Sequence, residues 1–118
     1  MAVENLPIFV KTYDFILWTL GHTAKFPKSA RFSVAVRLEN SLLDMLQSVM
    51  TANRLRDKTA RLEEADRRLE QARLLVRLSK DLRYINLSSY EYAARQMDEL
   101  GRMLGGWIKQ QKIVGGRG

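Results

Sequence analysis

The sequence contains no cysteine among its 118 residues. Disulfides and thiolate metal sites are therefore excluded, and the composition fits a protein of the reducing cytoplasm. Its apolar runs are only a few residues long, so no stretch is predicted to span a membrane. The first residues, MAVENLPIF, lack the basic start and the long apolar centre of a signal peptide. A chain of this length is expected to form a single domain with one core.

Histidine is scarce as well, because His22 is the only one in the chain. Its neighbours Gly21 and Thr23 offer no obvious catalytic partner, and a surface or helix-end position is the simpler interpretation. The Glu-x-x-His pairs of di-iron bundles are absent, since Thr19 stands three residues before His22. No glycine-rich phosphate loop follows a strand. The sequence therefore predicts a protein that is not an enzyme, with no catalytic residue, no metal site and no cofactor.

Apolar residues recur at intervals of three and four over four long segments, which is the spacing of one face of a helix. The expected helices cover residues 6–25, 29–55, 58–85 and 88–111. Phe26-Pro27 separates the first two, because proline disfavours the α-helical region in the residue before it. We predict an all-α, antiparallel up-down-up-down four-helix bundle as a single domain over residues 1–112, with a flexible C-terminal tail over residues 113–118.

Polar residues at the segment boundaries predict how the helices begin. Ser29 is the expected N-cap of the second helix, and Asp57 is the expected N-cap of the third. Ser88 and Glu91 have the spacing of a capping box at the start of the fourth.

The first two helices differ in how their apolar residues are arranged. The predicted core stripe of the first consists of Leu6, Phe9, Tyr13, Ile16, Leu17 and Leu20. The core row of the second includes Phe32, and a neighbouring row adds Val36, Leu43 and Met50. Because a helix with two apolar rows buries more than one side, the second helix is either central to a monomeric bundle or part of a subunit contact.

The last predicted helix contains Gly101, Gly105 and Gly106. Glycine inside a helix costs about 1 kcal/mol relative to alanine. Gly101 and Gly105 lie one turn apart, so we expect them to admit a close neighbour, from either the same subunit or the next one. Trp107 is expected to anchor the end of this helix as a core residue or an interface residue.

The chain has 20 Lys and Arg against 13 Asp and Glu, which gives a formal net charge of +7. Such an excess predicts a polyanion or an acidic protein surface as the partner. Arg73, Arg77 and Lys80 recur along one strip that no acidic residue balances, and we expect them to form a basic band with Arg54 and Arg83. A band of this kind would bind phosphates in a salt-dependent, largely sequence-independent way. The alternative is a solvated basic face without a ligand.

Aromatic residues do not add to this prediction. No interleaved row of exposed aromatic side chains, of the kind that stacks single-stranded bases, is expected along the basic band. Base-specific recognition is therefore not predicted.

Three motifs support a more specific hypothesis: FPKSARF at residues 26–32, RLEN at 37–40 and LGRMLGGWIK at 100–109. Together they resemble the bacterial four-helix-bundle family that includes the accessory variability determinant, Avd, of diversity-generating retroelements. The same superfamily contains proteins encoded by intervening sequences in bacterial large-subunit ribosomal RNA genes. The resemblance extends from about Tyr13 to Lys109, and its most specific part is the Gly-Arg-x-Leu-Gly-x-Trp-Ile pattern that begins at Gly101.

The resemblance implies a homo-oligomer, a pentameric barrel of four-helix bundles, whose positive surface binds RNA and DNA without sequence specificity. It also implies association with a reverse transcriptase, in support of mutagenic cDNA synthesis, and no catalytic residues in the accessory protein itself. The alternative is a structural or protein-interaction module of the ribosomal RNA intervening-sequence type, with no retroelement role.

Overall fold

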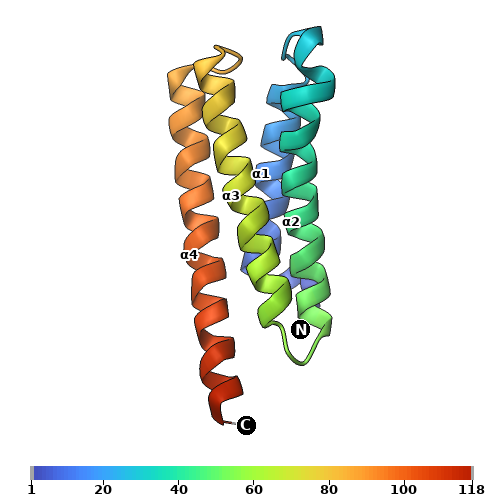
Figure 1. Cartoon of the computed structure of the whole chain (residues 1–118), viewed down its shortest axis with the longest axis vertical. Helices are drawn as coiled ribbons and strands as arrows, with labels where there is room; N and C mark the ends of the chain where they lie inside the picture. Colours follow the sequence, from blue (N-terminus) through green and yellow to red (C-terminus); the bar gives the residue numbers. More distant parts are fainter. Residues whose placement is uncertain (1, 118) are drawn as a thin grey trace.

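The computed structural model describes residues 2–117. Figure 1 shows four long helices, each antiparallel to the next along the chain, packed side by side as a bundle. They are α1 (Pro7–Thr23), α2 (Val36–Arg54), α3 (Thr59–Asp81) and α4 (Leu87–Arg117), and three short turns complete the elements: η1 (Val3–Asn5), η2 (Lys28–Ala30) and η3 (Arg31–Ala35). The predicted all-α four-helix bundle is confirmed. None of these described helices has both the length and the hydropathy needed to cross a bilayer.

The core lies along the bundle axis, where one face of each long helix is buried. The contact between α2 and α3 is the most extensive, and α4 packs against α3 while α1 packs against α2. Full burial of an aliphatic side chain stabilises a fold by about 1.5–3 kcal/mol. The apolar residues of the third and fourth helices that recur at intervals of three and four are buried, as the periodicity predicts, whereas Leu78 and Leu82, which were expected to widen the stripe of the third helix, are exposed. The buried residues are Leu62, Ala65, Leu69, Ala72, Val76, Ala93, Met97, Leu100 and Leu104.

The buried face of α1 differs from the predicted one, because Tyr13, Leu17 and Leu20 are exposed. The core instead receives Ile8, Thr12, Phe15, Ile16, Thr19 and Thr23. The hydroxyls of Thr12 and Thr19 donate hydrogen bonds to carbonyls one turn earlier, at 2.6 and 2.8 Å. A hydroxyl that is satisfied within its own helix costs little to bury. A face with threonines can therefore turn inward and leave an aliphatic stripe outside.

The start of α2 also differs from the prediction. A 3₁₀ turn (η2) and a π turn (η3) come first, so the α-helix begins at Val36 and Ser29 does not cap it. The hydrogen bonds of a π turn join residues five apart. Ala30 at the end of η2 and Ala35 at the end of η3 are buried, whereas Phe32, which was predicted in the core, is 86% exposed.

The starts of α3 and α4 differ from the predictions as well. The N-cap of α3 is Lys58 and not the predicted Asp57, which stands one residue earlier, although the Asp57 Oδ1 accepts a hydrogen bond from the Thr59 N–H at 3.1 Å. The capping box at Ser88 is wrong. The Oδ1 of Asn86 accepts a hydrogen bond from the Ser89 N–H at 2.8 Å, and α4 begins one residue before Ser88. Asparagine caps as well as serine, so sequence alone did not distinguish the two.

The C-terminal segment was predicted as a flexible tail from residue 113. In the structure α4 continues through Arg117, and Gly118 lies outside the described residues. Ile113 and Val114 are exposed, so this extension adds no buried face. Lengthening an existing helix requires no new nucleus, which explains how a helix can continue without apolar periodicity.

The turn between α3 and α4 depends on Arg83, whose φ is 64°. The Tyr84 N–H donates to the Ser79 carbonyl at 2.8 Å, and the Arg83 N–H donates to the Lys80 carbonyl at 2.9 Å. These two bonds define a Schellman motif, in which glycine is the usual residue at the left-handed position. An arginine there is strained, because its Cβ approaches the backbone.

We predict that Arg83→Gly raises the free energy of unfolding by about 1 kcal/mol, because glycine adopts the left-handed conformation without steric cost. Urea denaturation followed by circular dichroism measures the change. Arg83→Ala is the matched control, since it removes the same charge but keeps the Cβ. A glycine variant no more stable than the alanine variant would contradict this account of the turn.

Candidate nucleic-acid interface

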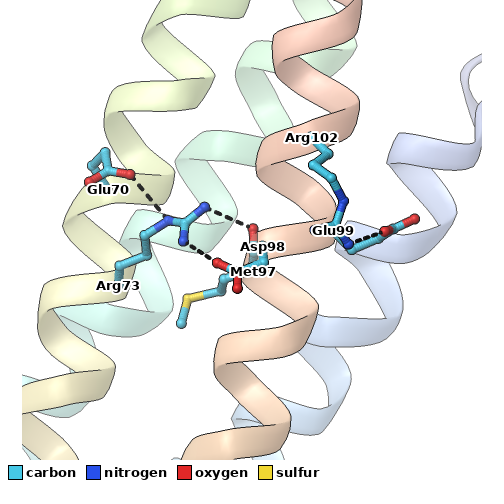
Figure 2. Close-up of polar contacts among 6 residues, drawn as sticks. All are labelled: Glu70, Arg73, Met97, Asp98, Glu99 and Arg102. Carbon is cyan, nitrogen blue, oxygen red and sulfur yellow. Dashed lines mark hydrogen bonds and ion pairs between the residues drawn. The ribbon is translucent and has the colours of Figure 1, made fainter.

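A shallow groove runs between α3 and α4 on the outside of the bundle. Its volume is about 370 Å³, and its lining includes Arg73 and Arg77 from the predicted basic band, beside Glu70 and Asp98. Figure 2 shows Arg73 reaching from α3 across to α4. The groove therefore contains acidic groups as well as the expected cations.

Arg73 bridges the two helices. Its Nη1 donates to Asp98 Oδ1 at 2.6 Å, and its Nη2 donates to the Met97 carbonyl at 3.1 Å (Figure 2). Its Nε is buried and lies 3.1 Å from Glu70 Oε1, an ion pair without hydrogen-bond geometry. The prediction that no acid balances this strip is wrong for Arg73, because Glu70 stands one turn before it and Asp98 reaches it from another helix. Its guanidinium holds α3 against α4.

Gly101 leaves room for this guanidinium. A Cβ at Gly101 would lie 2.6 Å from Arg73 Nη2, closer than Cβ atoms approach other side chains in folded proteins, so the guanidinium would have to move. The close neighbour expected at this glycine is therefore an arginine side chain of the same subunit. Gly105 differs, since a Cβ there would meet no atom within 4 Å. Trp107 is half-buried and packs against the core, but it lies within α4, which continues to Arg117.

The other members of the predicted band are distributed over the molecule. Arg77 is exposed, whereas the Lys80 Nζ lies 3.6 Å from Asp81 Oδ1 and 4.5 Å from the centre of the Tyr90 ring. Arg54 ends α2, and Arg83 follows α3, so the two lie at opposite ends of the bundle (Figure 1). A single continuous band through all five predicted cations is therefore wrong.

A second bridge connects α4 to α1. Glu99 accepts a hydrogen bond from Arg102 at 2.8 Å, and its other oxygen lies 3.6 Å from Lys11 Nζ of α1. The hydrogen bond from Arg102, followed by the charge of Lys11, lowers the pKa of Glu99. Two further cations of this surface are thus partly neutralised.

Sequence reasoning missed another group of cations, Lys25, Lys28 and Arg31, in the connection between α1 and α2. All three are exposed, and none of the ion pairs among residues 2–117 includes them. Lys28 and Arg31 line a cleft of about 390 Å³. A signal was available in the sequence, because the chain has no acidic residue between Asp14 and Glu39.

His22 closes the last turn of α1. Its Nδ1 lies 2.9 Å from the Trp18 carbonyl, and its ring stacks on Trp18 with centroids 3.9 Å apart. Its Nε2 is 3.4 Å from the Ser89 hydroxyl of α4. The predicted helix-end position is confirmed, and these contacts connect α1 to α4. Within the part of the chain that the structure describes, no cluster of three His, Asp or Glu could hold a metal ion.

We predict that Gly101→Ala and Gly105→Ala change stability differently. Alanine at Gly105 meets open space and should raise the free energy of unfolding by about 1 kcal/mol through helix propensity. Alanine at Gly101 displaces the Arg73 guanidinium from its hydrogen bonds and should leave that variant less stable than Gly105→Ala by about 1 kcal/mol or more. Chemical denaturation measures both changes. In an Arg73→Ala background the two substitutions should become equivalent; a difference that persists there would contradict the steric explanation.

Comparison with known proteins identifies the family of this chain. A family model described as bAvd-like matches residues 7–111, which include all of α1, α2 and α3 and most of α4. None of the curated proteins matches the chain. The resemblance inferred from FPKSARF, RLEN and LGRMLGGWIK is thereby confirmed at the level of the family. The chain belongs to the bAvd-like family.

Proposed function

We propose that this protein is a non-catalytic accessory protein of a diversity-generating retroelement. In this role it binds the reverse transcriptase and the template RNA or cDNA, and it supports mutagenic reverse transcription. The observation that carries the proposal is membership of the bAvd-like family, which supports an accessory protein of the Avd type. The net charge of +7 is consistent with a nucleic-acid partner.

The distribution of ion pairs suggests which cations contact nucleic acid. Arg73 and Arg102 are held by carboxylates of the same chain, and their first role is to join or brace helices. Arg77 and Arg83 are exposed and take part in none of the ion pairs among the described residues. Such cations are available for phosphate contacts, which position a nucleic acid without reading its sequence.

An exposed apolar surface supports self-association. Val10, Tyr13, Leu17 and Leu20 follow one another at helical spacing along α1, and each is at least 40% exposed. Leu43 of α2, which is 46% exposed, continues this stripe. It stands one turn after Glu39, whose carboxylate accepts a hydrogen bond from Thr23 of α1 at 2.5 Å, and so lies on the side of α2 that faces α1.

We call these five residues the α1–α2 apolar face. An uninterrupted apolar stripe along a helix is typical of a protein–protein interface. The face supports a homo-oligomer, and we propose a pentamer, as the resemblance to Avd implies.

We predict that RNA binding falls steeply with salt. If about six phosphates of a single strand are contacted, the affinity should fall by roughly 100-fold or more between about 50 and 200 mM salt. A fluorescence-anisotropy titration of a 30-nucleotide RNA at several salt concentrations measures this. Arg77→Glu/Arg83→Glu should weaken binding, whereas Arg68→Glu, which changes a cation already paired with Glu64, should have a smaller effect. No binding at low salt would contradict the proposal and favour a module that binds only protein.

We predict that Leu17→Glu converts the oligomer into a monomer, because a charge in the α1–α2 apolar face would be buried without a partner in the assembly. Sedimentation velocity at micromolar concentration measures the change. Leu74→Glu is the control, since Leu74 is 65% exposed on α3, outside that face. A monomeric wild-type protein, or an oligomer that tolerates Leu17→Glu, would contradict the assignment of the interface.

A further inference from the structure

One end of the bundle carries both the α1–α2 connection and the α3–α4 turn (Figure 1). Each contains an irregular backbone segment: the π turn of η3 in the first, and the left-handed Arg83 in the second. Irregular segments of both kinds cluster at functional sites. We call this region the turn end, defined by Lys25, Lys28, Arg31, Phe32 and Arg83.

The two connections are in contact with each other. The rings of Phe26 and Tyr84 lie 5.2 Å apart, centre to centre, at an angle of 45°. The π turn also packs against α3, the helix that Arg83 follows. The two connections that carry these cations therefore adjoin each other at this end of the bundle.

The π turn determines which side chain this surface presents. Ala35 is the buried residue of this turn, and Phe32 is 86% exposed, more than any other large apolar side chain among the described residues. Exposure of a phenylalanine to this extent contributes almost no burial to the fold. Its ring is available to a ligand.

The charges around Phe32 are predominantly positive. Lys25, Lys28, Arg31 and Arg83 are exposed and, within the described part of the chain, form no ion pair. Glu39 lines the same cleft as Lys28 and Arg31, but its carboxylate is engaged by the Thr23 hydroxyl. A hydroxyl does not cancel the charge of a carboxylate, so the cleft keeps one negative charge beside Lys28 and Arg31, and the four cations of the turn end outnumber it.

We propose that the turn end binds single-stranded nucleic acid, with a base stacked on Phe32 and the backbone phosphates held by Lys28, Arg31 and Arg83. An aromatic platform among cations is how proteins hold single strands without reading sequence, because every base has a π face. A duplex cannot use Phe32 in this way, since its bases are already stacked on one another. The inference rests on the proposed nucleic-acid binding and specifies the form of the nucleic acid and the residues that contact it.

The stacking is tested with a fluorescein-labelled 20-nucleotide oligo(dT) and a 20-base-pair duplex of mixed sequence as probes. Phe32→Ala should lower the single-strand affinity by about tenfold and leave the duplex affinity unchanged. Phe32→Trp should retain single-strand binding, because it preserves the aromatic face. Leu87→Ala is the matched control: Leu87 is an apolar residue, 62% exposed, at the start of α4, and it has no ring to stack. The exposure of Phe32 allows the variants to fold, and circular dichroism verifies this.

The phosphate contacts are tested by salt dependence. Lys28→Gln/Arg31→Gln should reduce the slope of log affinity against log salt by about 1.4 for the single strand, which corresponds to two phosphates. Arg61→Gln/Arg68→Gln, which removes two cations paired with Glu64 near the start of α3, should leave the slope unchanged.

The possible outcomes separate this inference from the function on which it rests. If the wild-type protein binds both probes and Phe32→Ala leaves single-strand binding unchanged, or weakens both probes equally, the inference fails and the proposed nucleic-acid binding stands. If the wild-type protein binds neither probe at low salt, both fail. If Phe32→Ala abolishes co-purification with a retroelement reverse transcriptase but not oligo(dT) binding, the turn end binds protein, and the inference is overturned.

Discussion

The contact between the buried faces of α2 and α3 is the interaction on which the rest of the bundle depends. Leu42 and Met45 on α2, and Leu62 and Leu69 on α3, have no exposed surface. The chain has no cysteine, so no disulfide can take over the role of this burial. α1 packs against α2, α4 packs against α3, and α1 and α4 also contact each other. Since the central pair supplies much of the core, the two outer helices can present other features to the solvent.

Buried hydroxyl groups allow α1 to keep apolar side chains on its outer surface. Thr12, Thr19 and Ser79 each donate to a carbonyl one turn earlier in the same helix, at 2.6 to 2.8 Å. No partner helix is needed to satisfy them, so they can occupy the core without a buried polar network. Burying these hydroxyl groups costs little free energy, so an aliphatic stripe can stay on the surface of α1. A chain that folded only as a monomer would gain by the opposite arrangement.

Periodicity predicted the fold and the main buried rows of α3 and α4, but it placed Leu78 and Leu82 of the third helix in the stripe, and both are exposed. The prediction failed on α1, because α1 has more apolar residues than positions in the core, and the face that is buried is the one that carries the threonines. It failed at Phe32 because a π turn rotates side chains relative to an α-helix, and the sequence carries no strong signal for that turn. The prediction of the basic band failed for a different reason. Asp98, the partner of Arg73, is 25 residues away in the sequence and comes close only when α3 and α4 pack together.

Whether a cation forms an ion pair depends on the regularity of the backbone around it. Where α3 and α4 run side by side, acidic residues lie within reach of the cations. Arg73 therefore pairs with Asp98 across the two helices, and Gly101 leaves room for its guanidinium. At the turn end the helices stop, no acidic residue precedes Glu39 for two dozen positions, and Lys28 and Arg31 form no ion pair with the described residues. Arg83 belongs with them: it occupies a position where glycine would be less strained, so the fold bears a cost for keeping a guanidinium there. In the binding proposed for the turn end, a phosphate of the nucleic acid would pair with this strained arginine, which makes no ion pair with the described chain.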